Sequence, residues 1–223
     1  MQNIAVIPAR KGSVGLPGKN QVFFDTTADF IASVSWFGRV IVSTDDEVVA
    51  GKARKRSFDV RDRPAVLAGP AVSIKAVFDD LIPAMSVAAD DVLWLFYLPI
   101  LFKDRRHFDE ARRVMEGEGA DSLCSFVVAQ THPFNCWAYE GGALRQYIPN
   151  DVFRRQDLPP AWMTYHYLCC FRAGALPALN SELIGPSTRP IFLDQATTAN
   201  LIEIDTPEDL ERWKAHQARS QRQ

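Results

Sequence analysis

The sequence predicts an α/β fold with a mainly parallel sheet, and two observations lead to this class. The chain has 223 residues, of which 47% are hydrophobic, so it can bury a full core as one domain with at most a small appendage. Short apolar runs alternate with longer amphipathic stretches, which favours βαβ units over a β-sandwich.

The apolar runs give the expected strands, each of them largely buried. They cover residues 4–7, 40–43, 92–97, 122–128, 165–171 and 201–203. Crossover helices are expected between them, over residues 46–56, 73–81 and 104–115. The first of these helices carries Val48, Val49 and Ala53 on one face.

The last helix has the clearest start signal. Thr206 is a good N-cap, Pro207 suits the first turn, and two acidic residues follow. Leu210 and Trp213 would face inward. The polar sequence HQARSQRQ after them is expected to fray.

Residues 132–160 break the alternation. This segment contains five aromatic residues, a Gly141-Gly142 turn and the charged run RRQD. The pattern predicts a β-hairpin followed by an extended arm. An aromatic hairpin outside the sheet must cover something, which is either its own domain or another subunit.

The charge balance excludes partners that bind through a large net charge of the whole protein. The 25 basic and 27 acidic residues give a net charge of -2, which predicts neither nucleic-acid nor membrane binding. No apolar run reaches the length of a membrane span, and residues 1–20 lack the order of a signal peptide. We therefore expect a cytoplasmic protein.

The four cysteines are too few and too irregularly spaced for a disulfide framework, so reduced thiols are expected. A zinc site is the alternative, although no pair of ligands has finger-like spacing. Its ligands would be Cys136, His132, Cys170 and His166.

The loop after the first strand has the chemistry of a phosphate site. Gly12, Gly15 and Gly18 permit close approach of the backbone, and Arg10 and Lys19 supply positive charge. An ordinary surface loop is the alternative. The Walker A motif fails because Lys19 is not followed by Ser or Thr, and the dinucleotide motif fails on glycine spacing.

The amino-acid sequence of this loop resembles that of a known protein family. IPARKGSVGLPGKN resembles the pattern I-P-A-R-x-G-S-K-G-x-P-x-K-N of the CMP-sialic acid synthetases, or acylneuraminate cytidylyltransferases. Further matches follow in that family's order. They are VIVSTDDEVVA (40–50), RPAVLAGPAVS (63–73), GADSLCSF (119–126), RRQDLPPAW (154–162) and IEIDTPEDLERW (202–213).

The resemblance implies a three-layer Rossmann-like nucleotidyltransferase fold with an inserted β-hairpin dimerisation arm. The nucleotide-binding core would be residues 1–131 and 165–223, and the arm residues 132–164. The implied reaction is a Mg²⁺-dependent transfer of CMP from CTP to an acidic nine-carbon (nonulosonic) sugar. The implied assembly is a homodimer formed through the arm. Synthetases for the eight-carbon sugar Kdo share the fold and chemistry, but the RRQDLPP arm and the IEIDTPEDLERW tail favour the nonulosonic group.

The resemblance also implies the nucleotide-binding residues. They are Arg10, Gly12, Ser13, Gly15, Lys19, Asn20, Arg63 and Ser73, with Lys19 on the phosphates. Charge builds on phosphate oxygens in this chemistry, so catalysis should rest on positioning, cations and metal. Arg10, Lys19 and Asp205 are the expected catalytic residues. A strand-end salt bridge is the alternative for Arg63.

Metal and sugar ligands are expected elsewhere. Asp205 and Glu203 match an Asp-x-Asp pair that would hold magnesium, and a helix cap is the alternative for Asp205. The sugar-binding candidates are Tyr97, Arg154, Arg155 and Gln156. An arginine fork in the arm could pair with the substrate carboxylate, and an ordinary surface pair is the alternative.

Several positions depart from the family pattern. Val14 replaces a lysine, Tyr97 replaces a glutamine, Glu203 replaces an aspartate, and residues 20–39 are shorter than usual. These changes indicate an altered sugar specificity or weakened catalysis. The second hypothesis is therefore a catalytically weak nucleotide-binding homologue with a regulatory or scaffolding role.

Overall fold

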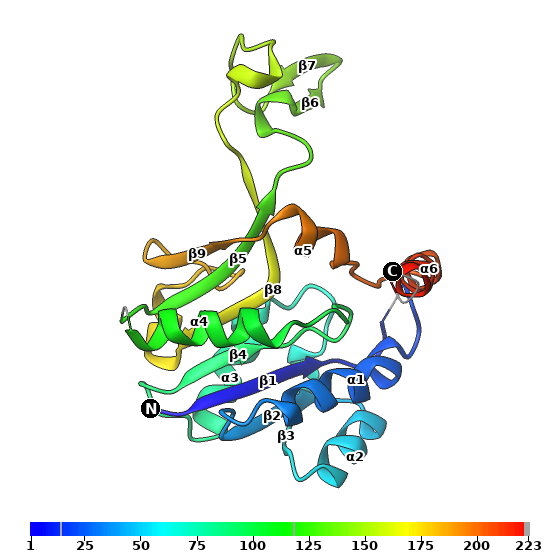
Figure 1. Cartoon of the computed structure of the whole chain (residues 1–223), viewed down its shortest axis with the longest axis vertical. Helices are drawn as coiled ribbons and strands as arrows, with labels where there is room; N and C mark the ends of the chain where they lie inside the picture. Colours follow the sequence, from blue (N-terminus) through cyan, green and yellow to red (C-terminus); the bar gives the residue numbers. More distant parts are fainter. Residues whose placement is uncertain (14, 118, 221–223) are drawn as a thin grey trace.

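The computed structural model describes residues 1–13, 15–117 and 119–220. Its centre is a seven-stranded sheet with the order β3-β2-β1-β4-β8-β5-β9 (Figure 1). The strands are β1 (Asn3–Ala9), β2 (Arg39–Thr44), β3 (Asp59–Asp62), β4 (Val92–Leu95), β5 (Ser122–Val128), β8 (Trp162–Arg172) and β9 (Thr188–Phe192). β8 runs antiparallel to its neighbours β4 and β5, and the other neighbouring pairs are parallel. The mainly parallel sheet is thus confirmed.

Helices cover both faces of this sheet. They are α1 (Lys19–Ser33), α2 (Glu47–Lys55), α3 (Ile74–Ala84), α4 (Arg105–Gly117), α5 (Gln195–Asn200) and α6 (Pro207–Ser220). Side chains alternate between the two faces of a strand. Ala5 and Ile7 of β1 therefore pack in one core cluster with α1, α2 and α4, whereas Ile4 and Val6 join the other with α3. The result is the three-layer fold that the resemblance implies.

Helix caps set where the helices begin. The Asp46 carboxylate caps α2 by accepting a hydrogen bond from Val48 N at 2.9 Å. Val49 and Ala53 of this helix are buried as predicted, but Val48 is 51% exposed because it lies at the outer edge of the apolar face. At α6, Thr206 Oγ1 accepts from Asp209 N at 3.2 Å, so the predicted cap is confirmed.

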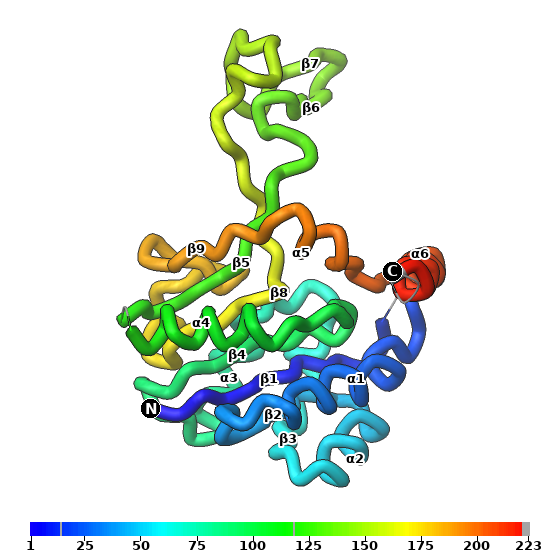
Figure 2. Tube along the Cα trace, in the orientation of Figure 1, coloured from blue at the N-terminus to red at the C-terminus, as the bar shows by residue number. Residues whose placement is uncertain are grey.

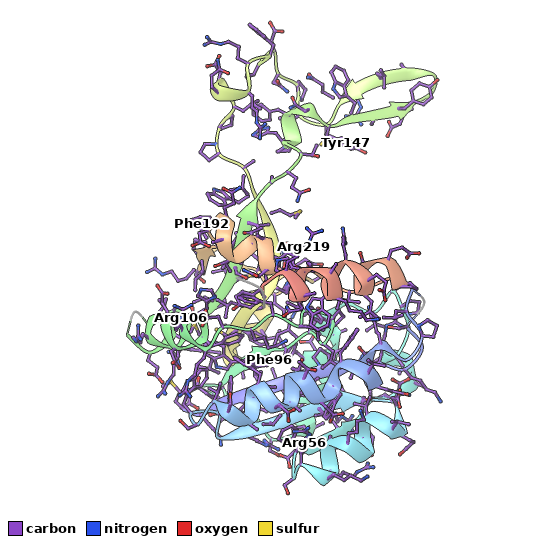
Figure 3. All side chains as sticks on the ribbon, turned by 45° about the vertical axis from the view of Figure 1, so that its right-hand side comes forward. Arg56, Phe96, Arg106, Tyr147, Phe192 and Arg219 are labelled. Atoms are coloured by element: carbon purple, nitrogen blue, oxygen red, sulfur yellow. The ribbon has the colours of Figure 1, made fainter. Side chains whose placement is uncertain are left out.

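The aromatic segment forms an arm that projects from the sheet between β5 and β8 (Figures 1 and 2). Its outer part is the predicted hairpin, β6 (Trp137–Glu140) and β7 (Ala143–Gln146), joined at Gly141 and Gly142. Both glycines have positive φ, 60° and 83°, which a tight hairpin turn requires. Figure 3 shows Tyr147 on the arm and Phe192 near its base.

Large apolar side chains of the arm are open to solvent. Trp137, Tyr139, Leu144 and Tyr147 are each more than half exposed, and Phe153 is 92% exposed. The hairpin therefore does not cover its own domain. A surface of this kind is typical of a protein interface.

Two expectations for the secondary structure are wrong, and some elements were not expected at all. Residues 201–203 do not form a strand, because Glu203 makes only a single bridge, to Ile100. α1 and the strands β3 and β9 were not expected. α6 continues through Ser220, since no glycine or proline interrupts it, so HQARSQRQ is helical as far as that residue. Residues 221–223 lie outside the described residues.

Short 3-10 turns complete the fold at Ala65–Leu67, Pro133–Asn135, Arg155–Asp157 and Ala173–Ala178. Within the described residues, no helix combines the length and the apolar character needed to cross a bilayer.

Candidate active site

A cavity of about 230 Å³ lies at the carboxyl ends of β1 and β4. These strands are neighbours, but the chain leads from β1 to β2 on one side and from β4 towards β5 on the other. Such a switch in strand order opens the crevice where α/β sheets bind ligands. The lining residues are Pro8, Arg10, Ser13, Lys19, Asn20, Arg63, Val72, Ile74, Val77, Tyr97, Pro99 and Glu203.

The loop after β1 is held in place by its own polar groups. Asn20 Nδ2 donates to Arg10 O at 2.9 Å, and Arg10 Nη1 donates to Gly12 O at 3.1 Å. Lys11 N donates to Asp45 Oδ1 at 2.6 Å, which ties the loop to the end of β2. Arg10 and Asn20 therefore meet the cavity in a fixed arrangement.

Gly15 lies against the segment that carries the expected metal ligands. A Cβ atom at this position would stand 2.4 Å from Asp205 O, closer than any real contact. The loop can approach Asp205 only because residue 15 has no side chain. Val14, beside it, lies outside the described residues.

Arg63 brings a buried positive charge to the cavity. Its side chain is 8% exposed, and its guanidinium donates to Ser43 Oγ at 3.2 Å and to Ser43 O at 2.9 Å. Among the described residues, no carboxylate lies within salt-bridge distance of it. Burial lowers the pKa of Arg63, a sign that the charge is poorly solvated. An anion in the cavity would relieve that cost.

Lys19, from the first turn of α1, forms an ion pair with Asp205. The Lys19 side chain is mostly buried, with 16% exposed, whereas that of Asp205 is 55% exposed. Lys19 thus stands between the cavity and the carboxylates beside it. It also lies at a helix N-terminus, which favours anions.

Glu203 and Asp205 lie close enough to repel each other. Glu203 is exposed overall, yet it lines the cavity. Desolvation there, followed by the charge of Asp205, raises the pKa of Glu203. Asp205 does not cap α6, because Thr206 Oγ1 takes that role by accepting from Asp209 N at 3.2 Å, and the Asp205 carboxylate is paired with Lys19.

These two carboxylates fit a magnesium ion, which the resemblance implies. Mg²⁺ prefers oxygen ligands and is held by one or two carboxylates together with waters. The negative charge of Asp205 makes ionisation of Glu203 less favourable, and a divalent cation would reduce this repulsion. Lys19 now supplies that positive charge and would have to share Asp205 with the metal.

Tyr97 lines the same cavity where the family has glutamine. Burial, and next the neighbouring Cys169, raise the pKa of Tyr97 above its ordinary value. Its hydroxyl group therefore stays neutral and can both donate and accept a hydrogen bond.

The remaining expected site residues lie outside the cavity lining. Ser73 caps α3, because its Oγ accepts from Ala76 N at 3.2 Å. Arg154 is paired with Asp157 of the same arm, at 2.6 and 2.9 Å. Arg155 lines a separate groove of about 400 Å³ on the arm, and Gln156 follows it in the same turn. Within one chain, the arm residues are thus not brought to the cavity.

Sequence reasoning missed the supporting residues Ser43 and Asp45, which orient Arg63 and the loop. Both lie in the matched stretch VIVSTDDEVVA, and their place at the end of a buried strand is the signal that could have found them.

The alternative zinc site from the sequence is not assembled. His132 and Cys136 lie on the arm, and Cys170 packs in the core cluster that contains α1 and α4, on the opposite face of the sheet from Cys169. The four expected ligands therefore do not meet.

Comparison with known proteins finds sequence relatives among the N-acylneuraminate cytidylyltransferases. No family model matches the chain. An N-acylneuraminate cytidylyltransferase of Streptococcus agalactiae serotype V is 28% identical over 172 residues, which are 73% of this chain and 41% of that protein. The same enzyme of serotype III is 27% identical over the same coverage. The chain thus matches about two fifths of the length of these relatives.

Solved structures show the same fold. A CMP:2-keto-3-deoxy-manno-octonic acid synthetase complexed with CTP superposes with a TM-score of 0.67 and 16% identity, covering 99% of this chain and 100% of that one. The 2-C-methyl-D-erythritol 4-phosphate cytidylyltransferase of Francisella tularensis superposes with a TM-score of 0.62 and 13% identity, and the match covers 95% of this chain and 98% of that one.

Proposed function

We propose that this chain, a divergent relative of the N-acylneuraminate cytidylyltransferases, transfers CMP from CTP to the anomeric hydroxyl of an acidic nonulosonic sugar. The observation that carries the proposal is the cavity at the switch point of the sheet. It gathers Arg10, Lys19 and the buried, unpaired Arg63 around a space that needs an anion.

The reaction forms a bond between the anomeric oxygen and the α-phosphorus of CTP. It breaks the bond from that phosphorus to the oxygen bridging to the β-phosphate, so pyrophosphate leaves. The hydroxyl proton passes to solvent. Negative charge develops on the phosphate oxygens, and fixed cations that face them lower the barrier without a covalent intermediate.

Each cation of the cavity has a distinct place in this scheme. Arg63, fixed by Ser43, offers a rigid fork to one phosphate group. Arg10 shapes the loop and faces the same space, while Lys19 is a mobile charge that can leave Asp205 when phosphate arrives. Glu203 and Asp205 would hold magnesium, whose charge would neutralise further phosphate charge.

Recognition of the sugar needs the arm of a second subunit in this proposal. Arg154, Arg155 and Gln156 are exposed and do not line the cavity of their own chain. A homodimer formed through the exposed aromatic residues of the arm would bring one chain's arm towards its partner's cavity. The planar arginine fork then pairs with the sugar carboxylate.

A second candidate function is nucleotide binding without turnover, in a regulatory or scaffolding protein. The ion pair that engages both Lys19 and Asp205, together with the departures at Tyr97 and Glu203, is the observation that favours it.

Release of pyrophosphate separates the two candidates. The protein is incubated with CTP and a panel of eight- and nine-carbon acidic sugars, with and without Mg²⁺. Release that depends on both the metal and one sugar supports the transferase. Tight CTP binding without release for any sugar refutes it and favours the second candidate.

Thermal unfolding with CTP, UTP, GTP or ATP tests base selectivity independently, because a ligand bound only by the folded state raises the unfolding midpoint.

A further inference from the structure

We propose a second metal site, specific for a soft cation such as Zn²⁺, formed by Cys124, His166 and Cys169. The ligand atoms of these three side chains all lie within 4.8 Å of one another. They come from the adjacent strands β5 and β8, and the site is separate from Glu203 and Asp205.

The two thiols face each other across the strand pair. Cys124 and Cys169 are directly opposite in the antiparallel ladder, and both are buried, at 0% and 2% exposed. The register of the ladder shifts between Cys124 and Phe126, because residues 165–168 of β8 lie opposite Ser125 alone. Such an irregularity re-aims side chains, and His166 lies within it.

His166 completes the group with a nitrogen ligand. Its Nε2 lies 2.9 Å from Glu182 O, and a carbonyl oxygen can only accept a hydrogen bond, so Nε2 carries the proton. Nδ1 is then the nitrogen with a lone pair. A metal-bound histidine is commonly held in this way, with its second nitrogen donating to a backbone carbonyl or a carboxylate.

The donor set selects the class of metal. Two sulfurs and one imidazole nitrogen suit Zn²⁺ or another soft ion, and not Mg²⁺. Two thiolates neutralise the charge of one Zn²⁺, so the buried site would carry no net charge. Binding releases both thiol protons to solvent. The fourth position is open to a water.

The proposed zinc site adjoins the candidate active site through Tyr97. The ring of Tyr97, which lines the cavity, meets that of His166 edge-on at 5.7 Å and 88°. β5 and β8 are also the strands from which the arm leaves and to which it returns. A metal held here would fasten the base of the arm and fix the position of Tyr97.

Cobalt is a direct probe, because tetrahedral thiolate-bound Co²⁺ gives intense visible and charge-transfer bands. The full-length protein is reduced, stripped with chelator and titrated with Co²⁺ and then with Zn²⁺. We expect saturation at about one Co²⁺ per chain, loss of the bands when Zn²⁺ displaces it, and a higher unfolding midpoint with Zn²⁺. Absence of thiolate bands from the folded wild-type protein would overturn the proposal.

Variants assign the ligands. His166→Gln and Cys169→Ser should abolish the bands, and His166→Gln keeps the test valid if the buried serine disturbs folding. Cys170→Ala is the matched control, since Cys170 is the next residue in β8 and is equally buried but packs on the opposite face of the sheet. Bands that survive His166→Gln, or that disappear in a folded Cys170→Ala protein, refute the assignment.

The Asp205→Asn variant keeps this proposal distinguishable from the proposed function. It alters the expected magnesium site and leaves the three soft ligands intact, so its cobalt spectrum should equal that of the wild type. A spectrum lost in this variant would place the cobalt at the other site and overturn the proposal.

Discussion

Replacing Arg63 with methionine separates a ligand-binding role from a structural one. Methionine keeps much of the length and the apolar stem but removes the charge. The substitution loses two hydrogen bonds to Ser43, each worth about 1.5–3 kcal/mol for a charged donor. It also removes a desolvation penalty of several kcal/mol, because the guanidinium is 8% exposed and has no carboxylate partner among the described residues.

The two effects of Arg63→Met nearly cancel in the free protein. We expect its free energy of unfolding to change by less than about 2 kcal/mol, measured by urea denaturation. Affinity for CTP should fall by roughly 10–150-fold in calorimetry, which corresponds to about 1.5–3 kcal/mol for one lost charge-assisted contact.

Arg61→Met is the matched control for this experiment. Arg61 lies two residues away and forms a bidentate pair with Asp80, at 2.9 and 2.8 Å, outside the cavity lining. It should lose a little stability, about 1 kcal/mol or less for a partly exposed pair, and retain its affinity for CTP. Unchanged CTP affinity in Arg63→Met, with stability reduced by more than about 3 kcal/mol, would show that Arg63 is purely structural.

Four further predictions follow from the same geometry. Lys19→Ala should weaken CTP binding by about tenfold or more without unfolding the protein, because its partner Asp205 is solvent-exposed; a wild-type affinity in calorimetry would remove Lys19 from the phosphate site. Asp205→Asn should lower turnover and shift its magnesium dependence to higher concentrations, so identical magnesium titrations of variant and wild type would contradict the metal role. Gly15→Ala should displace the loop from Asp205 and reduce turnover more than stability, whereas Gly51→Ala in α2, whose Cβ meets nothing within 4 Å and which lies outside the cavity lining, controls for the loss of a glycine; equal turnover in both variants would refute the close-approach argument. Light scattering at micromolar concentration should give a dimer that Phe153→Asp dissociates, and a wild-type monomer would contradict assembly through the arm.

Much of the candidate site was accessible from the sequence because its residues lie in short, linear motifs. Arg10, Lys19 and Asn20 belong to one loop, and Arg63 and Tyr97 each follow a strand that ends at the same edge of the sheet. Parallel topology alone brings such positions together. The relatives confirm the family resemblance on which these assignments depended.

What the sequence did not predict depends on pairing between distant segments. Residues 201–203 have the composition of a strand, but backbone partners decide whether a strand forms, and here only Glu203 finds one. Cys124 meets Cys169 because of the antiparallel register of β5 and β8, which no local pattern encodes. Likewise, the sequence did not predict α1, because the apolar residue Val22 lies on its exposed side and interrupts the amphipathic pattern.

The contact of Gly15 and Lys19 with Asp205 has a consequence for how the protein is made. The loop after β1 and a segment 186 residues further along the chain form one wall of the site. A ribosome releases these parts in order, so β1 and its loop must wait for nearly the whole sheet to be synthesised. The nascent chain therefore cannot assemble this wall, and nucleotide cannot assist the early stages of its folding.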